Sequence, residues 1–587
     1  MTCATKLGMI KPSEEYAAVP RTDLILIHAP SVYDFRHKTI LYGPCSDQVP
    51  SSPIFELYPI GFTSIADYLE RAGFRVRIVN LAVRMLQDPR FDAERLIREL
   101  DAPAFGIDLH WLLHCHGSIE VAKIVKRHHP DSKVIFGGLS ASYFHRQLIE
   151  YPEIDCVVRG DSAEEPLRQL MKCIVKGAEP TQVPNLTWRD SAGEIWENPF
   201  THVPDDLSKV MVNYYNNMLR SVVRYRDLNS SLPFRHWLRY PITAVLTCRG
   251  CTHNCIICGG SCAAFRQCYN RERPAFRKPE AVARDVKNIS RFSNGPIFVL
   301  GDLMQAGEEY AYKLLKLLKR NKVRNRLILE LFGPAPREFI KKMGESCPGF
   351  CLEISPESHD PEIRNACGRN YSTEALEDTI AAALQAGCSR MDIFFMFGLP
   401  RQTPQSAMQT VDYCRHLFET FQDRRIFPFT APLSPFLDPG SLAFENPERY
   451  GYRLLFRTLE EHRQALLAPS WKYTLNYETQ WMSRAELVES TYNAELALSR
   501  LKANYGIITR QQASETIHRL YTAIEMMQEI DKILASGKDQ GKQLAAIKDT
   551  VDWVNMSRAG GKQELELPVK GAAIKPLGAL RSILIGR

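Results

Sequence analysis

The sequence predicts an α/β protein built from two successive parallel sheets and a helical C-terminal region. Short apolar segments alternate with helical segments twice, over residues 21–180 and again over 236–440. Beyond residue 440 the apolar side chains recur at helical spacing instead. Alternating strands and helices form parallel sheets that bind ligands at the carboxyl ends of their strands. We therefore expect two candidate ligand sites, one for each sheet.

The first series predicts a doubly wound sheet of the flavodoxin type. After an N-terminal tail (1–20), five short apolar strands linked by helices are expected within residues 21–180. Residues 181–235, with their prolines, aromatics and polar runs, are expected to form a connector. The expected strands are 23–30, 75–80, 104–110, 133–138 and 155–161, and the expected helical stretches include 93–100, 117–128, 139–149 and 163–175.

The second series predicts an open partial barrel over residues 236–440. Six βα units fall short of the eight that close a barrel, so we expect a (βα)6 arrangement. Its active site should lie at the carboxyl ends of the strands. The expected strands are 241–247, 296–301, 327–333, 349–355, 390–398 and 425–433.

A helical domain is expected at 441–560, followed by a short basic tail at 561–587. Ser483 and Glu486 form a capping box that would begin a helix, and Gly506 is placed to end it. The apolar residues that recur at helical spacing include Leu454, Leu455, Leu459 and Leu466.

The composition is that of a soluble globular protein with two or three domains. At 587 residues, with 45% hydrophobic and 24% charged residues, the chain is too long for one core. Its net charge of +7 is mild, and nucleic acid is not an expected partner. No signal peptide or transmembrane segment is recognisable, so we expect a cytoplasmic location. Its 16 cysteines then indicate local metal or redox chemistry and free thiols, not disulfides.

The most informative motif is the loop "TCRGCTHNCIICGGS" at residues 247–261. Cys251, Cys255 and Cys258 follow the first expected strand of the second series in a C-x3-C-x2-C arrangement. Three thiolates at this spacing can ligate three irons of a [4Fe–4S] cluster and leave the fourth iron open to a small molecule. The alternative is a structural zinc site, in which Cys248 pairs with Cys251 and Cys255 pairs with Cys258.

Residues 236–437 resemble the radical S-adenosylmethionine (radical SAM) superfamily. The resemblance implies that S-adenosylmethionine chelates the free iron of the cluster through its amino and carboxylate groups. The residue before the last cysteine is commonly aromatic in that family and packs on the adenine, whereas this chain has Ile257. The implied cluster ligands are Cys251, Cys255 and Cys258, and the implied bystanders are Cys248, Cys262 and Cys268.

Three further segments fit the resemblance and imply contacts to S-adenosylmethionine. "VLGDLMQAG" (299–307) stands where the family contacts the methionine part, although the usual Gly-Gly-Glu is absent. "EISPESHDPEIRNACGRNYSTE" (353–374) contains the family's "ES" segment, and "FGLPRQT" (397–403) has the glycine that lets backbone approach the adenine. For each carboxylate the alternative is a helix cap. The candidate residues are Gly301, Asp302, Glu353, Ser355, Glu357 and Gly398.

Residues 21–176 resemble the cobalamin-binding domain that often precedes this barrel. The matching pieces are "YPIGFTSIADYLERAGFRVRIVN", "FGGLSAS" and "RGDSAEEPL". The alternative is another flavodoxin-like ligand, or none, because glycine pairs after strands are common in turns. By position, the residues implied to admit the nucleotide tail of cobalamin are Gly137, Gly138 and Ser140, with Gly160 and Glu164 nearby.

The motif that supplies a lower cobalt ligand in many cobalamin domains is absent. That motif is Asp-x-His-x-x-Gly, and its nearest match, "DLHWLL" (108–113), has Leu113 at the glycine position and follows the third strand. Many cobalamin-dependent radical SAM proteins also lack it. His110 and Trp111 are candidates to approach the lower face of the corrin, the alternative for each histidine being an ordinary packed or surface imidazole.

The two resemblances together imply radical chemistry on an unactivated carbon. A one-electron reductant such as flavodoxin or ferredoxin would reduce the cluster, a 5′-deoxyadenosyl radical would form, and methylcobalamin would supply a methyl group. The cobalamin domain should then cap the barrel mouth. No catalytic residue is assigned, and small molecules, lipids and peptides are all open as substrates. An aromatic segment (470–481) is expected either to line the substrate pocket or to pack the tail, through Trp471, Tyr473, Tyr477 and Trp481.

Four alternatives remain open from the sequence. A cobalamin enzyme of this class can cyclise or oxidise its substrate without transferring methyl. A methylthiotransferase would need three further cysteines, Cys3, Cys45 and Cys115, but would end in a small β-domain. A cobalamin or redox sensor would bind both cofactors without turnover. A zinc-stabilised scaffold would contain no labile sulfide.

Overall fold

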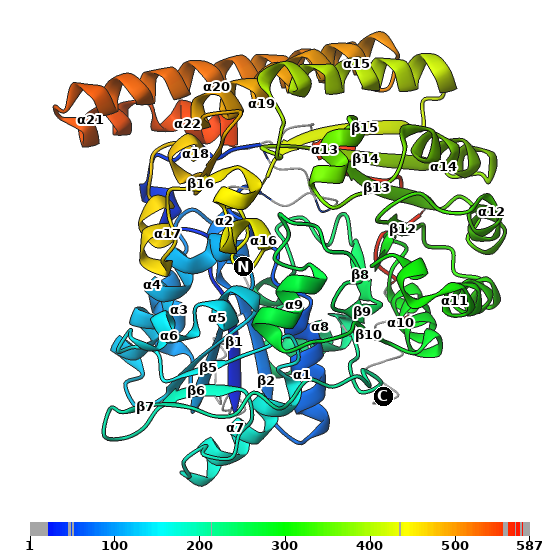
Figure 1. Ribbon diagram of the computed structural model, residues 1–587. Coiled ribbons are helices and arrows are strands. Elements are labelled where there is room, and N and C mark those ends of the chain that lie inside the picture. Colours follow the sequence, from blue (N-terminus) through cyan, green and yellow to red (C-terminus); the bar gives the residue numbers. More distant parts are fainter. Residues whose placement is uncertain are drawn as a thin grey trace, which may run out of the picture.

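The computed structural model describes residues 22–44, 49, 52–212, 214–433, 436–555, 562–569, 571–575 and 578. Cys3 and Cys45, the expected N-terminal tail and much of the expected basic tail lie outside these residues. The first domain, the barrel and the C-terminal helices lie against one another (Figure 1). None of the described helices is long and apolar enough to cross a bilayer.

The first sheet has a doubly wound core of five parallel strands, as predicted. Its strand order begins β2-β1-β3-β4-β5. All residues of β1 and β3 are buried because helices cover both faces of the sheet. The strands are β1 (Leu24–His28), β2 (Val76–Asn80), β3 (Ala104–Asp108), β4 (Lys133–Gly137) and β5 (Cys156–Val158). The helices are α1 (Gly61–Arg71), α2 (Leu81–Gln87), α3 (Ala93–Glu99), α4 (Cys115–His128), α5 (Leu139–Tyr143), α6 (His145–Ile149) and α7 (Glu164–Lys176).

Two antiparallel strands extend this sheet within residues 181–235, where we expected no strand. β6 (Leu186–Arg189) pairs with β5, and β7 (Ile195–Glu197) forms the outer edge. Both are short, and every residue of β7 is exposed, so the sequence carries no alternation of apolar and polar residues there. The rest of this segment contains α8 (Tyr214–Tyr225), which is also absent from the expected connector.

The second sheet is the open, six-stranded parallel barrel that the sequence predicts. Its order is β15-β14-β13-β12-β11-β8, and the two edge strands do not pair with each other. The strands are β8 (Thr243–Leu246), β11 (Ile297–Leu300), β12 (Leu327–Leu331), β13 (Cys351–Glu357), β14 (Arg390–Phe397) and β15 (Ile426–Pro432), with a small hairpin of β9 (Cys248–Arg249) and β10 (Ala275–Phe276). The helices are α9 (Cys262–Tyr269), α10 (Pro279–Phe292), α11 (Glu308–Asn321), α12 (Arg337–Ser346), α13 (Pro361–Ala366), α14 (Thr373–Gln385) and α15 (Pro404–Phe421).

The C-terminal region is mainly helical, with one correction to the sequence prediction. Leu454 ends a short strand, not a helix, because its segment pairs antiparallel with residues 477–479. The predicted capping box at Ser483 and Glu486 is present and begins α19. The elements are α16 (Leu442–Glu445), β16 (Tyr452–Leu454), α17 (Leu459–Ala465), α18 (Trp471–Thr474), β17 (Tyr477–Thr479), α19 (Arg484–Asn504), α20 (Arg510–Ser536), α21 (Gln540–Ala546), α22 (Lys548–Asn555) and α23 (Lys562–Leu565).

Residues 562–569 return to the barrel and span its open side. Leu565 packs in a buried cluster with Phe394 and Phe429, which lie on β14 and β15. Two residues further on, the backbone N–H of Leu567 donates to the Tyr240 hydroxyl, just before β8. The segment therefore joins the two unpaired edges of the sheet.

Candidate functional site

A cavity of about 450 Å³ opens at the carboxyl ends of the barrel strands. This is the end of the sheet where we expected the active site. Its walls come from the cysteine loop, from the ends of β11, β12, β13 and β14, and from Leu433 and residues 436–438. The cavity is bordered by Cys251, Cys255 and Cys258, by Ile257, and by Gly301, Gln305, Glu330, Glu357, Arg369 and Asp438, among others.

All three thiols of the motif border one cavity, so they are available to ligate one group between them. Burial raises the pKa of the Cys251 thiol to about 11, and Cys255 adds to that effect.

Backbone contacts hold the cysteine loop in place. The Gln305 amide oxygen accepts the Thr252 N–H at 2.8 Å and lies 3.4 Å from the Cys251 sulfur. Ile256 donates its N–H to the Cys367 carbonyl, and Asp438 accepts the Gly259 N–H at 3.0 Å. The loop is therefore anchored to three separate parts of the barrel.

Of the residues expected to contact S-adenosylmethionine, two border this cavity. Gly301 adopts a φ of +96°, and a Cβ there would lie 2.6 Å from the Thr247 hydroxyl, so the position requires glycine. Glu357 has a φ of +68° in a bulge of β13 and is paired with Arg369 at 3.0 Å. Both are candidates for direct contact with a ligand.

The other four expected residues do not border the cavity. Asp302 caps the short helix Leu303–Ala306, as in the helix-cap alternative that the sequence left open. It also accepts the Phe332 N–H. Glu353 and Ser355 lie on β13, below the cavity wall. Gly398 is packed so tightly that a Cβ would lie 2.4 Å from the Tyr477 hydroxyl. Its backbone is therefore covered by the C-terminal region.

Sequence reasoning missed Glu330 and Arg369. Glu330 is a charged residue in the apolar run "LILELFG", and its carboxylate accepts the Gly301 N–H at 2.7 Å. Arg369 comes from the loop after α13 and pairs with Glu357, while its positive charge opposes the burial that raises the pKa of Cys255. A charge inside an apolar strand is the one signal that could have revealed Glu330.

Glu330 gives a pH-dependent prediction for the cofactor-free protein. Burial raises its pKa to about 7, so folding favours the protonated form. Stability is then lost as pH rises from the unfolded pKa near 4.5 through 7. The Glu330→Gln variant should gain on the order of 3 kcal/mol at pH 8 relative to pH 4.5. Thermal melts at both pH values measure this, with the exposed Glu338→Gln as control; an equal gain at both values would contradict it.

A second cavity, of about 540 Å³, lies between the first domain and the barrel. It reaches down between strands β1, β3, β4 and β5 to Leu26, Gly106, Ile135 and Val158. On the barrel side it is bordered by residues of β8, β9, β11 and α9. The first domain thus faces the barrel mouth across this cavity, and its depth and small side chains suit a large flat ligand with a long tail.

Four of the five residues expected near the cobalamin tail border this cavity, but two are already engaged. Gly138 packs against the His110 backbone, where a Cβ would approach within 2.6 Å. The Ser140 hydroxyl donates to the His110 carbonyl and does not border the cavity. Glu164 forms a buried ion pair with Arg249. The cavity residues among the five are Gly137, Gly138, Gly160 and Glu164.

The ion pair of Glu164 crosses between the two domains. Arg249 donates to both Glu164 oxygens, at 2.5 and 2.9 Å, and to the Ser162 hydroxyl at 3.0 Å. Although burial opposes ionisation, Arg249 holds the pKa of Glu164 below its ordinary value. Arg271 pairs with Asp161 beside it. Since Arg249 stands two residues before Cys251, these contacts fix the cysteine loop to the first domain.

His110 and Trp111, the two candidates to approach the lower face of the corrin, both border the second cavity. Below them, Asp108 pairs with His28 at 2.9 Å, and the His28 and His114 rings lie 4.7 Å apart. Burial lowers the pKa of His110, so its imidazole is neutral. A neutral imidazole retains a lone pair for a metal.

The two cavities share a thin wall. Its residues come from the ends of β8 and β11 and from β9, which places the two ligand spaces side by side. They are Leu246, Cys248, Gly250 and Leu300.

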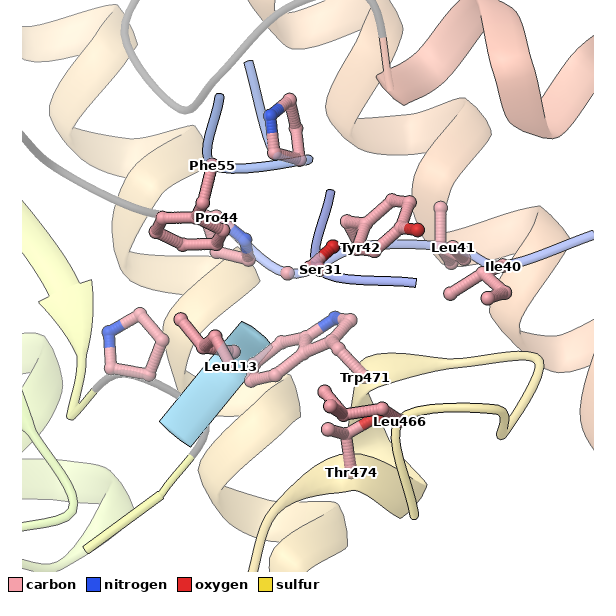
Figure 2. A pocket seen from close by; sticks show the side chains of 13 residues that line it. Ser31, Ile40, Leu41, Tyr42, Pro44, Phe55, Leu113, Leu466, Trp471 and Thr474 are labelled. Atoms are coloured by element: carbon pink, nitrogen blue, oxygen red, sulfur yellow. The ribbon is translucent and has the colours of Figure 1, made fainter. Parts of the chain in front are cut away.

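The aromatic segment 470–481 mostly packs the C-terminal region. Tyr477 is fully buried against Gly398, and Tyr473 donates to Asp531. Trp481 stacks on Gly451. Trp471 alone borders a small separate pocket (Figure 2). The packing alternative thus describes three of the four rings.

Comparison with known families matches both domains. The B12 binding domain family matches residues 52–170, and the Radical SAM superfamily matches residues 245–414. The chain therefore contains a B12-binding domain followed by a radical SAM domain.

Among curated proteins, the chain is similar to the hopanoid C-3 methylase of Methylococcus capsulatus. The identity is 25% over 286 residues, covering 47% of this chain and 48% of the methylase. The chain thus spans about half the length of that relative.

Two solved structures share the fold. The methyltransferase TsrM from Kitasatospora setae, with cobalamin and a [4Fe–4S] cluster bound, has a TM-score of 0.53 at 17% identity, covering 74% of this chain and 81% of TsrM. OxsB, with aqua-cobalamin and S-adenosylmethionine bound, has a TM-score of 0.55 at 12% identity, covering 97% of this chain and 81% of OxsB.

Proposed function

We propose that this protein is a cobalamin-dependent radical SAM enzyme that transfers a methyl group to an unactivated carbon. The observation that carries the proposal is the pair of cavities divided by a thin wall, one bordered by the three thiols and the other reaching into the B12-binding domain. When bound, the cluster with S-adenosylmethionine supplies a 5′-deoxyadenosyl radical and cobalamin supplies the methyl group.

The residues around the first cavity would hold the cluster and S-adenosylmethionine. Cys251, Cys255 and Cys258 are the proposed cluster ligands. Ile257, which borders the same cavity, offers an aliphatic surface where relatives have an aromatic one. The buried carboxylates of Glu330 and Glu357 are placed to receive an amino group.

The residues around the second cavity would hold cobalamin. Gly137, where a Cβ would meet nothing nearer than 3.9 Å, leaves room along the sheet for the nucleotide tail. Gly160, Gly138 and Glu164 support that cavity through packing and the domain contact. The chain's own contribution is positioning and exclusion of water, because the cofactors carry the difficult chemistry.

The proposal implies two partners and a reducing environment. A one-electron donor such as flavodoxin or ferredoxin would reduce the cluster. The substrate would be a small molecule, a lipid or a peptide. Every cysteine among the described residues is a free thiol, which suits a reducing compartment such as the cytoplasm.

The test is anaerobic reconstitution with iron, sulfide and hydroxocobalamin, followed by dithionite and S-adenosylmethionine. We expect slow release of 5′-deoxyadenosine, formation of S-adenosylhomocysteine and the absorption of methylcobalamin. If 5′-deoxyadenosine forms while cobalamin is never methylated, the enzyme belongs to the branch that does not transfer methyl. If neither product forms although both cofactors bind, the protein is better described as a cobalamin or redox sensor than as an enzyme.

A further inference from the structure

The wall between the two cavities is made of four residues. Among the described residues these four are the only ones that border both cavities, so the wall is one side chain thick. They come from the ends of the neighbouring strands β8 and β11, from β9, and from the position after β9. The wall residues are Leu246, Cys248, Gly250 and Leu300.

Two leucines form the apolar centre of the wall. Leu246 and Leu300 are partners in the parallel register of β8 and β11, and both are half-buried. Their strand neighbours Val245 and Val299 are fully buried in the hydrophobic core. Because side chains alternate between the two faces of a strand, the leucines share the opposite face from the valines. The two leucines therefore lie side by side toward the cavities.

Hydrogen bonds fix the backbone of the wall. The Leu246 carbonyl accepts from the buried Arg277 guanidinium at 3.0 Å, and the Leu300 carbonyl accepts the Thr247 hydroxyl at 2.5 Å. Arg277 is held in turn by an ion pair with Asp285 at 2.6 Å. Since the backbone is tied on both strands, a large group could pass only where the leucine side chains are removed.

Cys248 and Gly250 close the remainder of the wall. The Cys248 sulfur packs against Gly301, where a Cβ would lie 3.4 Å from it. Gly250 has a φ of +93°, and a Cβ there would lie 2.9 Å from the Arg271 side chain, so the position favours glycine. None of the four wall residues carries a charge. The wall thus presents a closed, uncharged surface to a ligand in either cavity.

The covalent structure of cobalamin determines which of its faces would meet this wall. Its nucleotide tail leaves the corrin ring on the lower side, and the deep part of the second cavity runs between strands of the first domain. A tail placed there turns the lower face of the ring toward His110 and Trp111. The upper face, which carries the exchangeable axial group, then faces the barrel and the wall.

We propose that the wall selects the upper axial group of the bound cobalamin. A methyl group or hydroxide fits between the corrin and the two leucines, whereas 5′-deoxyadenosyl carries a ribose and a purine that would have to enter the first cavity. The inference rests on the proposed function, because it places cobalamin in the second cavity. It makes Leu246 and Leu300 the residues that reserve the site for methylcobalamin, beside a cavity that holds the adenosyl group of S-adenosylmethionine.

The test compares methylcobalamin with adenosylcobalamin by equilibrium dialysis in the dark, on protein reconstituted with its cluster. The wild-type protein should bind methylcobalamin at least about tenfold more tightly, the scale on which a packed apolar site rejects an oversized group. In the Leu246→Ala/Leu300→Ala double variant the difference should shrink to less than about threefold, because the adenosyl group can enter the first cavity. S-Adenosylmethionine, added without a reductant, should then compete with adenosylcobalamin in the double variant alone.

Two other leucines provide matched controls. Leu433 borders the first cavity alone, and Leu57 borders the second cavity alone. Leu433→Ala and Leu57→Ala each enlarge one cavity without opening the wall. Both variants should therefore keep the wild-type preference for methylcobalamin, even if the affinity for every cobalamin changes.

The outcomes distinguish this inference from the proposed function. Equal affinity of the wild-type protein for the two cobalamins overturns the selection, and that measurement needs no variant. A preference that survives in the double variant, or adenosylcobalamin binding there that S-adenosylmethionine does not weaken, overturns the role of the two leucines. Binding of neither cobalamin overturns the cobalamin site itself. Absence of 5′-deoxyadenosine after reduction, with the preference intact, would count against the proposed function alone.

Discussion

Replacing Cys255 by alanine is expected to abolish reductive cleavage of S-adenosylmethionine. Cys255 is the middle thiol of the loop and borders the first cavity beside Arg369. A cubane held by two thiolates should be lost or degraded. Since loss of even an outer partner of a metal ligand costs about 10–100-fold, 5′-deoxyadenosine formation should fall by more than ~100-fold. Iron and labile sulfide content, with the product measured by chromatography, check the result.

Cys262→Ala provides the matched control. Cys262 lies four residues after Cys258 in the same stretch, but it begins α9 and does not border the cavity. Its removal should leave the iron content and 5′-deoxyadenosine formation unchanged. Equal losses in the two variants would mean that substitution disturbs the loop as a whole, so that the Cys255 thiol is not specifically required. A fully active Cys255→Ala variant would refute the ligand assignment.

Replacing Glu164 by alanine is expected to weaken the contact between the two domains severely. The change leaves the Arg249 guanidinium buried without its carboxylate, and breaking a buried pair costs about 3–5 kcal/mol. Because the pair links the B12-binding domain to the strand before Cys251, both cobalamin affinity and 5′-deoxyadenosine formation should fall. Equilibrium dialysis of hydroxocobalamin and limited proteolysis at pH 7 measure the effect.

Two further variants separate a domain contact from a direct contact with cobalamin. Glu165→Ala removes the neighbouring carboxylate, whose partners Arg168 and Tyr68 lie within the first domain, and should have little effect on cobalamin affinity. The double variant Glu164→Met/Arg249→Met removes both charges and should recover much of the cobalamin affinity. If affinity stays low in the double variant, Glu164 acts on cobalamin itself.

The same pair contributes a pH dependence of known sign. The pKa of Glu164 is lowered in the folded protein, so its contribution is present above the unfolded value near 4.5 and is lost as pH falls through the folded value. Acid should therefore loosen the domain contact.

Periodicity predicted both sheets because their strands are buried on both faces. The apolar runs of β1, β3 and β14 are long enough to be recognised without knowing their partners. β7 and β16 lack that signal, since each is a three-residue strand defined only by its antiparallel neighbour. Such strands exist through tertiary pairing and leave no local pattern.

At the site, the three candidate cysteines, whose spacing is local, border the same cavity. Three cysteines within eight positions on one loop reach one cavity because a short chain cannot carry them apart. Asp302 and Gly398 were assigned from their place after a strand, but whether a strand end faces the cavity depends on what packs above it. Tyr477 covers Gly398, and no sequence feature near Gly398 or Tyr477 indicates that contact.

The segment that spans the open side of the barrel affects how the protein is made. Leu565 meets Phe394 and Phe429 only after the entire C-terminal region has been synthesised. A growing chain therefore completes the six strands while their apolar lower interior still faces water, a stage at which α/β chains aggregate readily. Contacts of such long range also slow folding. Production at low temperature, or with chaperones, should accordingly improve the recovery of intact protein.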